Sequence, residues 1–334
     1  MSTLNRTTLL SLSAATCVVL LISTILAVGC KPADSAPKTV FVTRYGLGPD
    51  KWASAWLLKR HVDTNAEIRA VAPEAPLPPG VSFDTKGAVY QRQTDKTTFE
   101  VIREQHKLDD PIIRDLADLV HAIEVNFWSS PSNPTASVVE QGFRRLQQTY
   151  GRDQVTPECY MAYFDRVYQY LADYHHSDAL PQPARLEVEC TSQLDVTAAQ
   201  PNLVREMPIA ALLAELDRGK TVIFIDVREP EEFSEGHIPG AVNLTLRDAA
   251  PGIEKQLAGA DYVVSYCVKD FRGFEMARTL AELGVRNSVI LNPYGISGWV
   301  ANGLPVAGAK SMTETEASER LADCAQDPDR CLTP

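Results

Sequence analysis

The pattern of apolar positions divides the chain into a mostly helical first half and a second half in which strands and helices alternate. A β-rich run at 40–43 predicts a short strand, and the pattern at 50–63 predicts a helix. Together with three apolar stripes further on, they predict an α-rich domain with a small β component over residues 39–180. The stripes have the spacing of one face of a helix and contain Ile113, Leu116, Val120 and Ile123, then Phe143 and Leu146, then Met161, Phe164, Val167, Tyr168 and Leu171.

In the second half, short apolar runs predict strands and the segments between them predict helices. A helix near 208–216 precedes a strand at 221–226, and the apolar run at 262–267 leads into a helix that stops at Gly284. Alternation with short connections predicts a parallel sheet covered by helices on both faces, with functional residues at the carboxyl ends of its strands. We place this α/β domain at 204–310.

The segments beside the α/β domain have the composition of connections. Residues 181–203 are rich in proline and short polar side chains, which predicts an interdomain linker. Residues 311–334 form an acidic tail with one expected helix at 313–323.

Cys267 ends an apolar run and is followed by a helix, which places its thiol at a strand-to-helix turn. A helix N-terminus stabilises negative charge, and Lys269 and Arg272 add cations near the sulfur, although Asp270 opposes them. We therefore expect a nucleophilic thiol with a lowered pKa. The alternative is a buried and inert cysteine at a strand end.

Several separated motifs around Cys267 resemble the rhodanese (sulfurtransferase) domain over roughly residues 204–308. The motifs are Asp226-Val-Arg228, Glu232, the stretch 236–243, Cys267 with Arg272 five residues on, Gly284, Gly298-Trp299 and the stretch 303–306. The resemblance implies that Cys267 carries a persulfide and that Arg272 is a catalytic residue of the loop. It also implies a cradle for the transferred sulfur built from Val268, Lys269, Asp270, Phe271 and Gly273. The six-residue span from cysteine to arginine favours sulfur, because phosphatase and arsenate-reducing relatives tend to have a loop one residue longer.

Asp226 and Arg228 follow the strand next to the cysteine strand in sequence, so both can reach the same rim. In the rhodanese interpretation Asp226 helps to fix the loop, and a carboxylate such as Glu232 holds Arg228. A catalytic role and a purely structural ion pair remain alternatives for both residues.

The first half resembles the chromate-resistance protein family over about residues 39–175. The resemblance rests on short matches at 41–44, 50–63, 83–84, 98–100, 108–110 and 119–121. It implies a context of chromate or oxyanion stress, but Ser54-Ala55 replaces the usual Cys-Pro, so no thiol chemistry is expected there. An oxyanion ligand would require cations that fold together, and the candidates are Arg44, Lys59, Arg60 and Arg92.

The charge balance and the histidines exclude several classes of partner and cofactor. A net charge of -11 provides no basic field for nucleic acid. His121, and the pair His175 and His176, which are adjacent in sequence, lack the spacing of metal ligands. We expect neither a metal nor an organic cofactor.

The N-terminus has the pattern of an export signal. A single cation, Arg6, precedes an apolar stretch that ends in small residues before Cys30. The pattern resembles a bacterial lipoprotein, which implies a signal peptide at 1–29, lipidation of Cys30 and a tether at 30–38. Lys31 then favours the outer over the inner membrane. The alternative is an uncleaved membrane anchor, and either interpretation places the protein outside the cytoplasm, in the periplasm.

Counting cysteines in an oxidising compartment predicts two disulfides. Of the seven cysteines, Cys17 belongs to the leader, Cys30 to the lipid and Cys267 to the chemistry. The four that remain are expected to pair as Cys159 with Cys190 and Cys324 with Cys331.

The expected function is sulfur transfer from a small thiosulfate-like donor to a thiol or cyanide acceptor through a Cys267 persulfide. One alternative is a periplasmic module that binds or senses chromate, with the Cys267 loop reporting redox state. Another is a thiol-based oxyanion reductase, which usually requires a resolving cysteine.

Overall fold

The computed structural model describes residues 38–332 except 74, 94, 126–132, 153, 175–185 and 191–203. The expected signal peptide, Cys30, nearly all of the tether and most of the linker lie outside the described residues. From Lys38 onward the chain forms one compact unit, within which two domains follow each other along the sequence.

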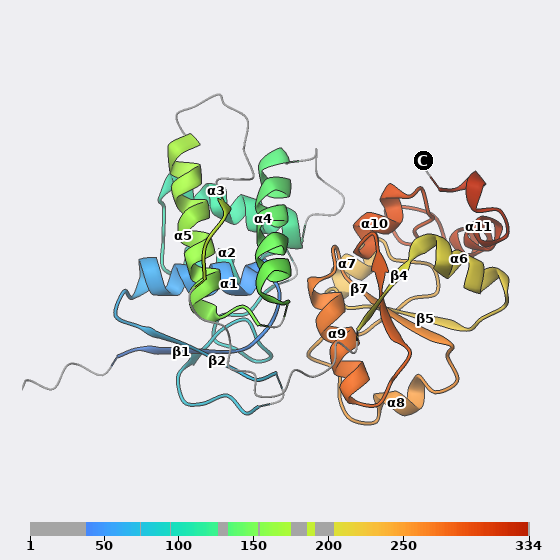
Figure 1. Cartoon of the computed structure of the whole chain (residues 1–334), viewed down its shortest axis with the longest axis horizontal. Helices are drawn as coiled ribbons and strands as arrows, with labels where there is room; N and C mark the ends of the chain where they lie inside the picture. Colours follow the sequence, from blue (N-terminus) through green and yellow to red (C-terminus); the bar gives the residue numbers. More distant parts are fainter. Residues whose placement is uncertain are drawn as a thin grey trace, which may run out of the picture. The chain divides into compact units, whose positions relative to one another are not determined.

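The first domain is α-rich with a small parallel sheet, as predicted (Figure 1). Its sheet has the order β2-β1-β3. The strands are β1 (Val40–Arg44), β2 (Glu67–Val71) and β3 (Val81–Ser82). The helices are α1 (Pro49–Leu57), continued by the π-helical turn η1 (Leu58–Val62), then α2 (Thr98–Gln105), α3 (Pro111–Glu124), α4 (Pro134–Tyr150) and α5 (Pro157–Tyr174).

Local sequence signals set where the helices of this domain begin. Thr97 caps α2 and forms a reciprocal pair of hydrogen bonds with Glu100, which satisfies backbone donors at the helix start. Asp110 and Asn133 accept hydrogen bonds from the first free N–H groups of α3 and α4. These caps hold α3 and α4 at defined start points.

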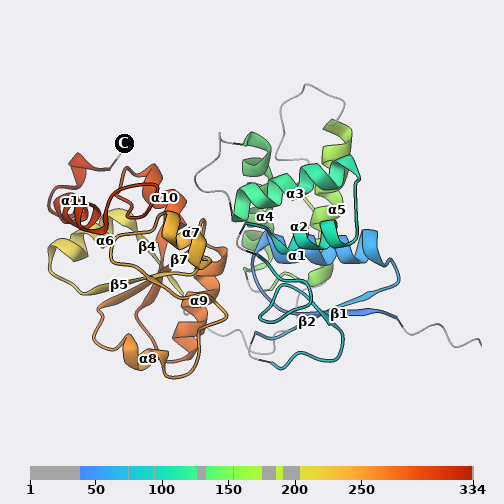
Figure 2. The same cartoon turned by 180° about the vertical axis from the view of Figure 1, so that it is seen from behind.

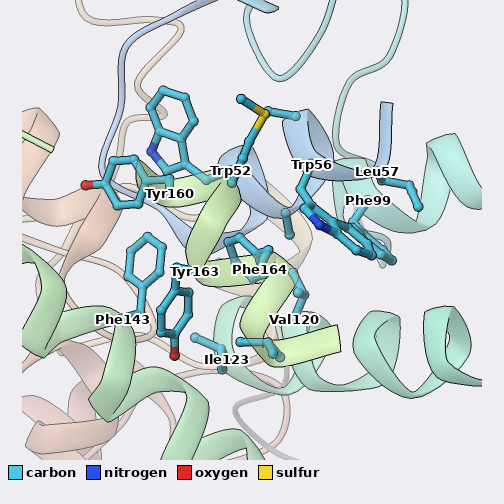
Figure 3. Close-up of a cluster of buried hydrophobic side chains, with 14 of the residues drawn as sticks. Trp52, Trp56, Leu57, Phe99, Val120, Ile123, Phe143, Tyr160, Tyr163 and Phe164 are labelled. Atoms are coloured by element: carbon cyan, nitrogen blue, oxygen red, sulfur yellow. The ribbon is translucent and has the colours of Figure 1, made fainter. Parts of the chain in front are cut away.

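Aromatic side chains from α1, α2, α4 and α5 fill the core of the first domain (Figure 3). The ring of Trp52 on α1 stacks on Tyr160 of α5 with centroids 4.7 Å apart, and Phe143 of α4 stacks on the same tyrosine at 5.1 Å. The indole N–H of Trp52 donates to the carbonyl of Gly46. Burial of rings of this size is the main source of stability in such a core.

The second domain is built on five parallel strands in the order β4-β8-β7-β5-β6, which confirms the predicted parallel sheet (Figure 2). The strands are β4 (Arg205–Pro208), β5 (Val222–Asp226), β6 (Val242–Asn243), β7 (Tyr262–Tyr266) and β8 (Ser288–Asn292). The helices are α6 (Ile209–Asp217), α7 (Pro230–Glu235), α8 (Ile253–Gln256), α9 (Phe271–Glu282), α10 (Gly295–Ala301) and α11 (Glu314–Gln326), followed by the 3-10 turn η3 (Pro328–Arg330).

Helices cover both faces of this sheet. Successive strand residues point to opposite faces, so neighbouring residues of β7 pack against different helices. Val264 packs with residues of α6, α10 and α11 on one face. Val263 packs with α9 residues such as Met276 and Leu280 on the other. Because the helices pack on the two faces, the loop that follows β7 lies at the carboxyl edge of the sheet.

Two disulfides join four of the five described cysteines, in the pairs expected from the sequence. Cys159 of α5 is bonded to Cys190, and Cys324 of α11 to Cys331, each with Cα atoms 5.5 Å apart. The tail is therefore an ordered part of the second domain, and its Leu321 and Cys324 lie in the core with α6.

Candidate active site at the cysteine loop

Cys267 lies at the predicted strand-to-helix turn. The strand β7 ends at Tyr266, and α9 begins at Phe271. Cys267 is the only free cysteine among the described residues, and it is only 2% exposed. The loop 267–270 thus holds one buried thiol at the start of a helix.

The start of α10 fixes the shape of this loop. The backbone N–H of Ile296 donates to the Cys267 carbonyl at 2.9 Å, and that of Ser297 donates to the Val268 carbonyl at 3.1 Å. A Cβ atom on Gly295 would lie 1.8 Å from the Lys269 carbonyl oxygen, and Gly295 has a φ of +62°. Only glycine fits this close approach. The backbone of α10 therefore holds the Cys267 and Val268 carbonyls in place by hydrogen bonds.

The expectation of a lowered thiol pKa is wrong for this structure. Burial raises the pKa of Cys267, and the carboxylates of Glu124 and Asp270 raise it further. Arg272 and the backbone N–H of Gly273 act in the opposite direction, as expected. Sequence patterns could predict neither the approach of Glu124, which lies at the end of α3, nor the depth of burial of the thiol.

Lys269 and Asp270 of the loop each pair with charged residues of the first domain. Lys269 lies 3.4 Å from Glu140 of α4. Asp270 is 1% exposed and forms ion pairs with Arg144, at 2.6 Å, and with Arg152. Burial would raise the pKa of Asp270, but the two arginines hold it below its usual value. Asp270 is therefore a neutralised anchor of the loop.

Arg272 is the cation that remains beside the sulfur. Its Nη1 lies 3.3 Å from Glu232, and its Nη2 donates to the backbone carbonyl of Glu124 at 3.0 Å. Burial works against the charged form, yet Glu232, Cys267 and Glu124 together raise the pKa of Arg272. Arg272 thus stays charged and links the loop to α3 and α7.

Asp226 and Arg228 form a buried ion pair with Nη2 2.6 Å from Oδ2, and each side chain is at most 1% exposed. Arg228 also donates to the Gly236 carbonyl. The carboxylate that holds Arg228 is therefore that of Asp226, and Glu232 instead pairs with Arg272. This geometry favours the structural interpretation of the Asp226–Arg228 pair, which fixes the chain after β5.

The four cations considered for an oxyanion ligand are not brought together. Arg44 donates to Ala75 and Thr85, Lys59 to the carbonyls of Thr64 and Ala66, Arg60 to Asp165, and Arg92 to Glu124. Each cation is thus occupied separately. Within the described residues no group of three or more His, Cys, Asp or Glu side chains is placed to hold a metal, and no helix is long and apolar enough to cross a membrane.

Comparisons with known proteins find a family match for each half of the chain. A family model described as the ChrB C-terminal domain matches residues 41–171, and one described as a rhodanese-like domain matches residues 209–302. The chain is 31% identical over 94 residues to the thiosulfate:glutathione sulfurtransferase of Saccharomyces cerevisiae, covering 25% of this chain and 67% of that protein. A sulfurtransferase of Allochromatium vinosum is 28% identical over 104 residues, covering 31% of this chain and 95% of the relative.

A relative with a different name shares the similarity. The dual specificity phosphatase Cdc25 of Arabidopsis thaliana is 30% identical over 106 residues, covering 28% of this chain and 72% of that protein. The matches named for sulfur transfer agree with the family model and with a loop that carries a single free cysteine. The chain belongs to the rhodanese-like family, and a ChrB C-terminal domain precedes its rhodanese-like domain.

Proposed function

We propose that this protein moves sulfane sulfur through a persulfide on Cys267. The observation that carries the proposal is the position of its free thiol, in the loop 267–270 directly before α9 begins, where the Gly273 N–H favours the charged form of the sulfur. Backbone donors and the helix dipole at such a position stabilise a negatively charged sulfur. Arg272 provides the nearby positive charge.

The reaction has two displacements. The Cys267 thiolate attacks the sulfane sulfur of a thiosulfate-like donor, so that an S–S bond forms to Cys267 and the donor's S–S bond breaks, with sulfite leaving with the electron pair. A thiolate or cyanide then attacks the outer sulfur, and the Cys267 thiolate is released. No external oxidant or reductant enters either step. The thiol must lose its proton first, so burial, which raises its pKa, makes turnover rise with pH towards that pKa.

The test is sulfur transfer from thiosulfate to cyanide, followed by the formation of thiocyanate. Wild type is expected to turn over, and Cys267→Ser is expected to lose all transfer above background. The control is the double variant Cys324→Ser/Cys331→Ser, because it removes the tail disulfide without leaving a new free thiol and does not touch the loop 267–270. Equal rates for wild type and Cys267→Ser would contradict the proposal.

We also propose that the protein is exported and lipid-anchored at Cys30, with the domains in the periplasm. The support is the leader pattern and the two disulfides, which persist in oxidising compartments. Membrane fractionation of the wild type and of Cys30→Ala tests this. Release of the variant from the membrane fraction supports the anchor, and identical fractionation contradicts it.

The two alternative functions gain no specific observation. The cations considered for an oxyanion site each have a separate partner. Every described cysteine other than Cys267 is bonded in a disulfide, so the described residues offer no resolving thiol for reduction.

A further inference from the structure

The first half of α9, which begins at the cysteine loop, packs against the ChrB-like domain. Phe271 makes an edge contact with Phe143 of α4 at 5.7 Å between centroids. The guanidinium of Arg152 lies 4.0 Å from the ring centre of Phe274. Phe271 and Phe274 are 1% and 4% exposed and belong to the same apolar cluster as the core of the first domain. The two domains therefore share a core directly under the loop.

Two arginines of the first domain enclose the carboxylate of the loop. Arg144 lies 2.6 Å from Asp270, and its guanidinium stacks 4.5 Å above the Phe271 ring. Arg152 contacts the other oxygen of Asp270. A buried carboxylate without such partners would carry a large desolvation penalty, so the loop depends on residues more than a hundred positions earlier in the chain.

A carboxylate of the first domain, that of Glu124, acts on the same thiol through its charge and contacts Arg272. Glu124, at the end of α3, is 4% exposed and lies between two arginines. Its Oε2 is 3.4 Å from Arg92 and 3.8 Å from Arg272. Among the described residues, the buried Nε–H groups of both arginines find no hydrogen-bond partner. Arg272 thus interacts through its charge with three groups, which are Cys267, Glu124 and Glu232 of α7.

We propose that the ChrB-like domain is part of the sulfur site, with Arg144, Arg152 and Glu124 as positioning residues of the cysteine loop. Arg144 and Arg152 act through Asp270, and Glu124 acts through Arg272. In its catalytic part this inference rests on the proposed sulfur transfer. The reactivity of the Cys267 thiol towards an alkylating agent tests it separately.

Glu124→Gln tests the electrostatic half of the proposal. The charged groups that act on the thiol are Glu124 from α3 and Asp270 and Arg272 from its own loop and helix. Removal of the Glu124 charge leaves Arg272 freer to stabilise a thiolate, so the pH midpoint of Cys267 alkylation, followed by peptide mass, should fall. Each unit of fall gives roughly tenfold more thiolate at a fixed pH below the midpoint. The control is Glu104→Gln, which breaks an exposed pair with Lys96. An unchanged midpoint in folded Glu124→Gln overturns this half.

Arg144→Gln tests the anchoring half. The Asp270 carboxylate, left with Arg152 as its remaining ion-pair partner, should raise the alkylation midpoint and lower kcat for thiosulfate several-fold. Asp270→Asn in the same chain should restore part of both, because it removes the charge left without a partner. The control is Arg145→Gln, the neighbouring arginine, which pairs with exposed Glu187.

A shift no larger than that of Arg145→Gln, or no rescue by Asp270→Asn, overturns the anchoring half. If Arg144→Gln does not fold, Arg144→Lys keeps the charge and should show a smaller shift in the same direction, and no shift overturns it. Absence of any sulfur transfer in wild type would defeat the proposed function, while the alkylation midpoints would still decide the positioning roles.

Discussion

At the scale of single residues, the two cations of the cysteine loop have different tasks. Arg272 is buried beside the thiol and bonded to Glu124 and Glu232, whereas Lys269 is part-exposed and faces Glu140. Arg272→Ala should therefore lower kcat/KM for thiosulfate by at least tenfold more than Lys269→Ala. Steady-state kinetics on both variants decides, and equal small losses would mean that the backbone amides act without the arginine.

A buried carboxylate of the first domain predicts a pH effect on stability. Burial, followed by repulsion from Asp84, raises the pKa of Asp50 from 3.8 to about 7. The folded state then holds a proton that the unfolded chain has lost, so the contribution of Asp50 is complete below pH 3.8 and is lost as the pH rises to about 7. Burial would raise the pKa of Asp84, but Lys51 holds it below its usual value, so Asp84 changes the stability only at a pH below 3.8.

The measurement is urea unfolding of wild type and Asp50→Asn between pH 4 and 7. Wild type should lose stability relative to the variant as the pH rises through this window. Parallel profiles would show that Asp50 is charged throughout. Asp50→Asn should be less stable than wild type at pH 4, because one oxygen that accepts from Thr98 or Phe99 is replaced by an amide donor.

At the scale of elements, sequence reasoning identified the strand that leads into Cys267, the strand-to-helix turn there and the parallel sheet. It could do so because β-branched runs and helical spacing are local signals. It could not find Glu124, Arg144 or Arg152 beside the loop, because such contacts depend on tertiary packing over long sequence separations. The pKa of Cys267 was misjudged for the same reason.

The contact between α10 and the cysteine loop gives a prediction at this scale. Gly295→Ala forces a Cβ into the Lys269 carbonyl at a positive φ, and should destabilise the fold by roughly 2–4 kcal/mol or distort the loop. Gly219→Ala is the control, because it has a φ of +74° but open space around its Cβ. It should cost only about 1 kcal/mol. Chemical denaturation compares the two, and equal losses would show that the close approach is unimportant.

At the scale of the whole molecule, the disulfides differ in the length of chain that they close. Cys159–Cys190 spans 31 residues and Cys324–Cys331 spans 7. The chain-entropy account gives about 3–4 kcal/mol for the first and about 2–2.5 kcal/mol for the second. Cys190→Ser should therefore lower the free energy of unfolding more than Cys331→Ser does, as measured by denaturant titration without reductant. The reverse order would show that local packing outweighs loop closure.

Shared packing under α9 also means that the two domains should unfold together. The residues Phe271, Phe274, Ala277 and Ile290 of the second domain lie in the apolar cluster of the first. Sequence patterns assigned each domain separately, because the apolar face of α9 could be satisfied by its own sheet. Only the folded chain shows that this helix packs on both sides.

The central claim is that Cys267 carries sulfur, and the most direct test is the mass of the peptide that contains it. After incubation with thiosulfate and removal of the donor, the Cys267 peptide of wild type should gain the mass of one sulfur atom, and addition of a thiol or cyanide should remove it. The matching peptide of Cys267→Ser should gain nothing. An unchanged Cys267 peptide at a pH above the alkylation midpoint of the thiol would contradict the account.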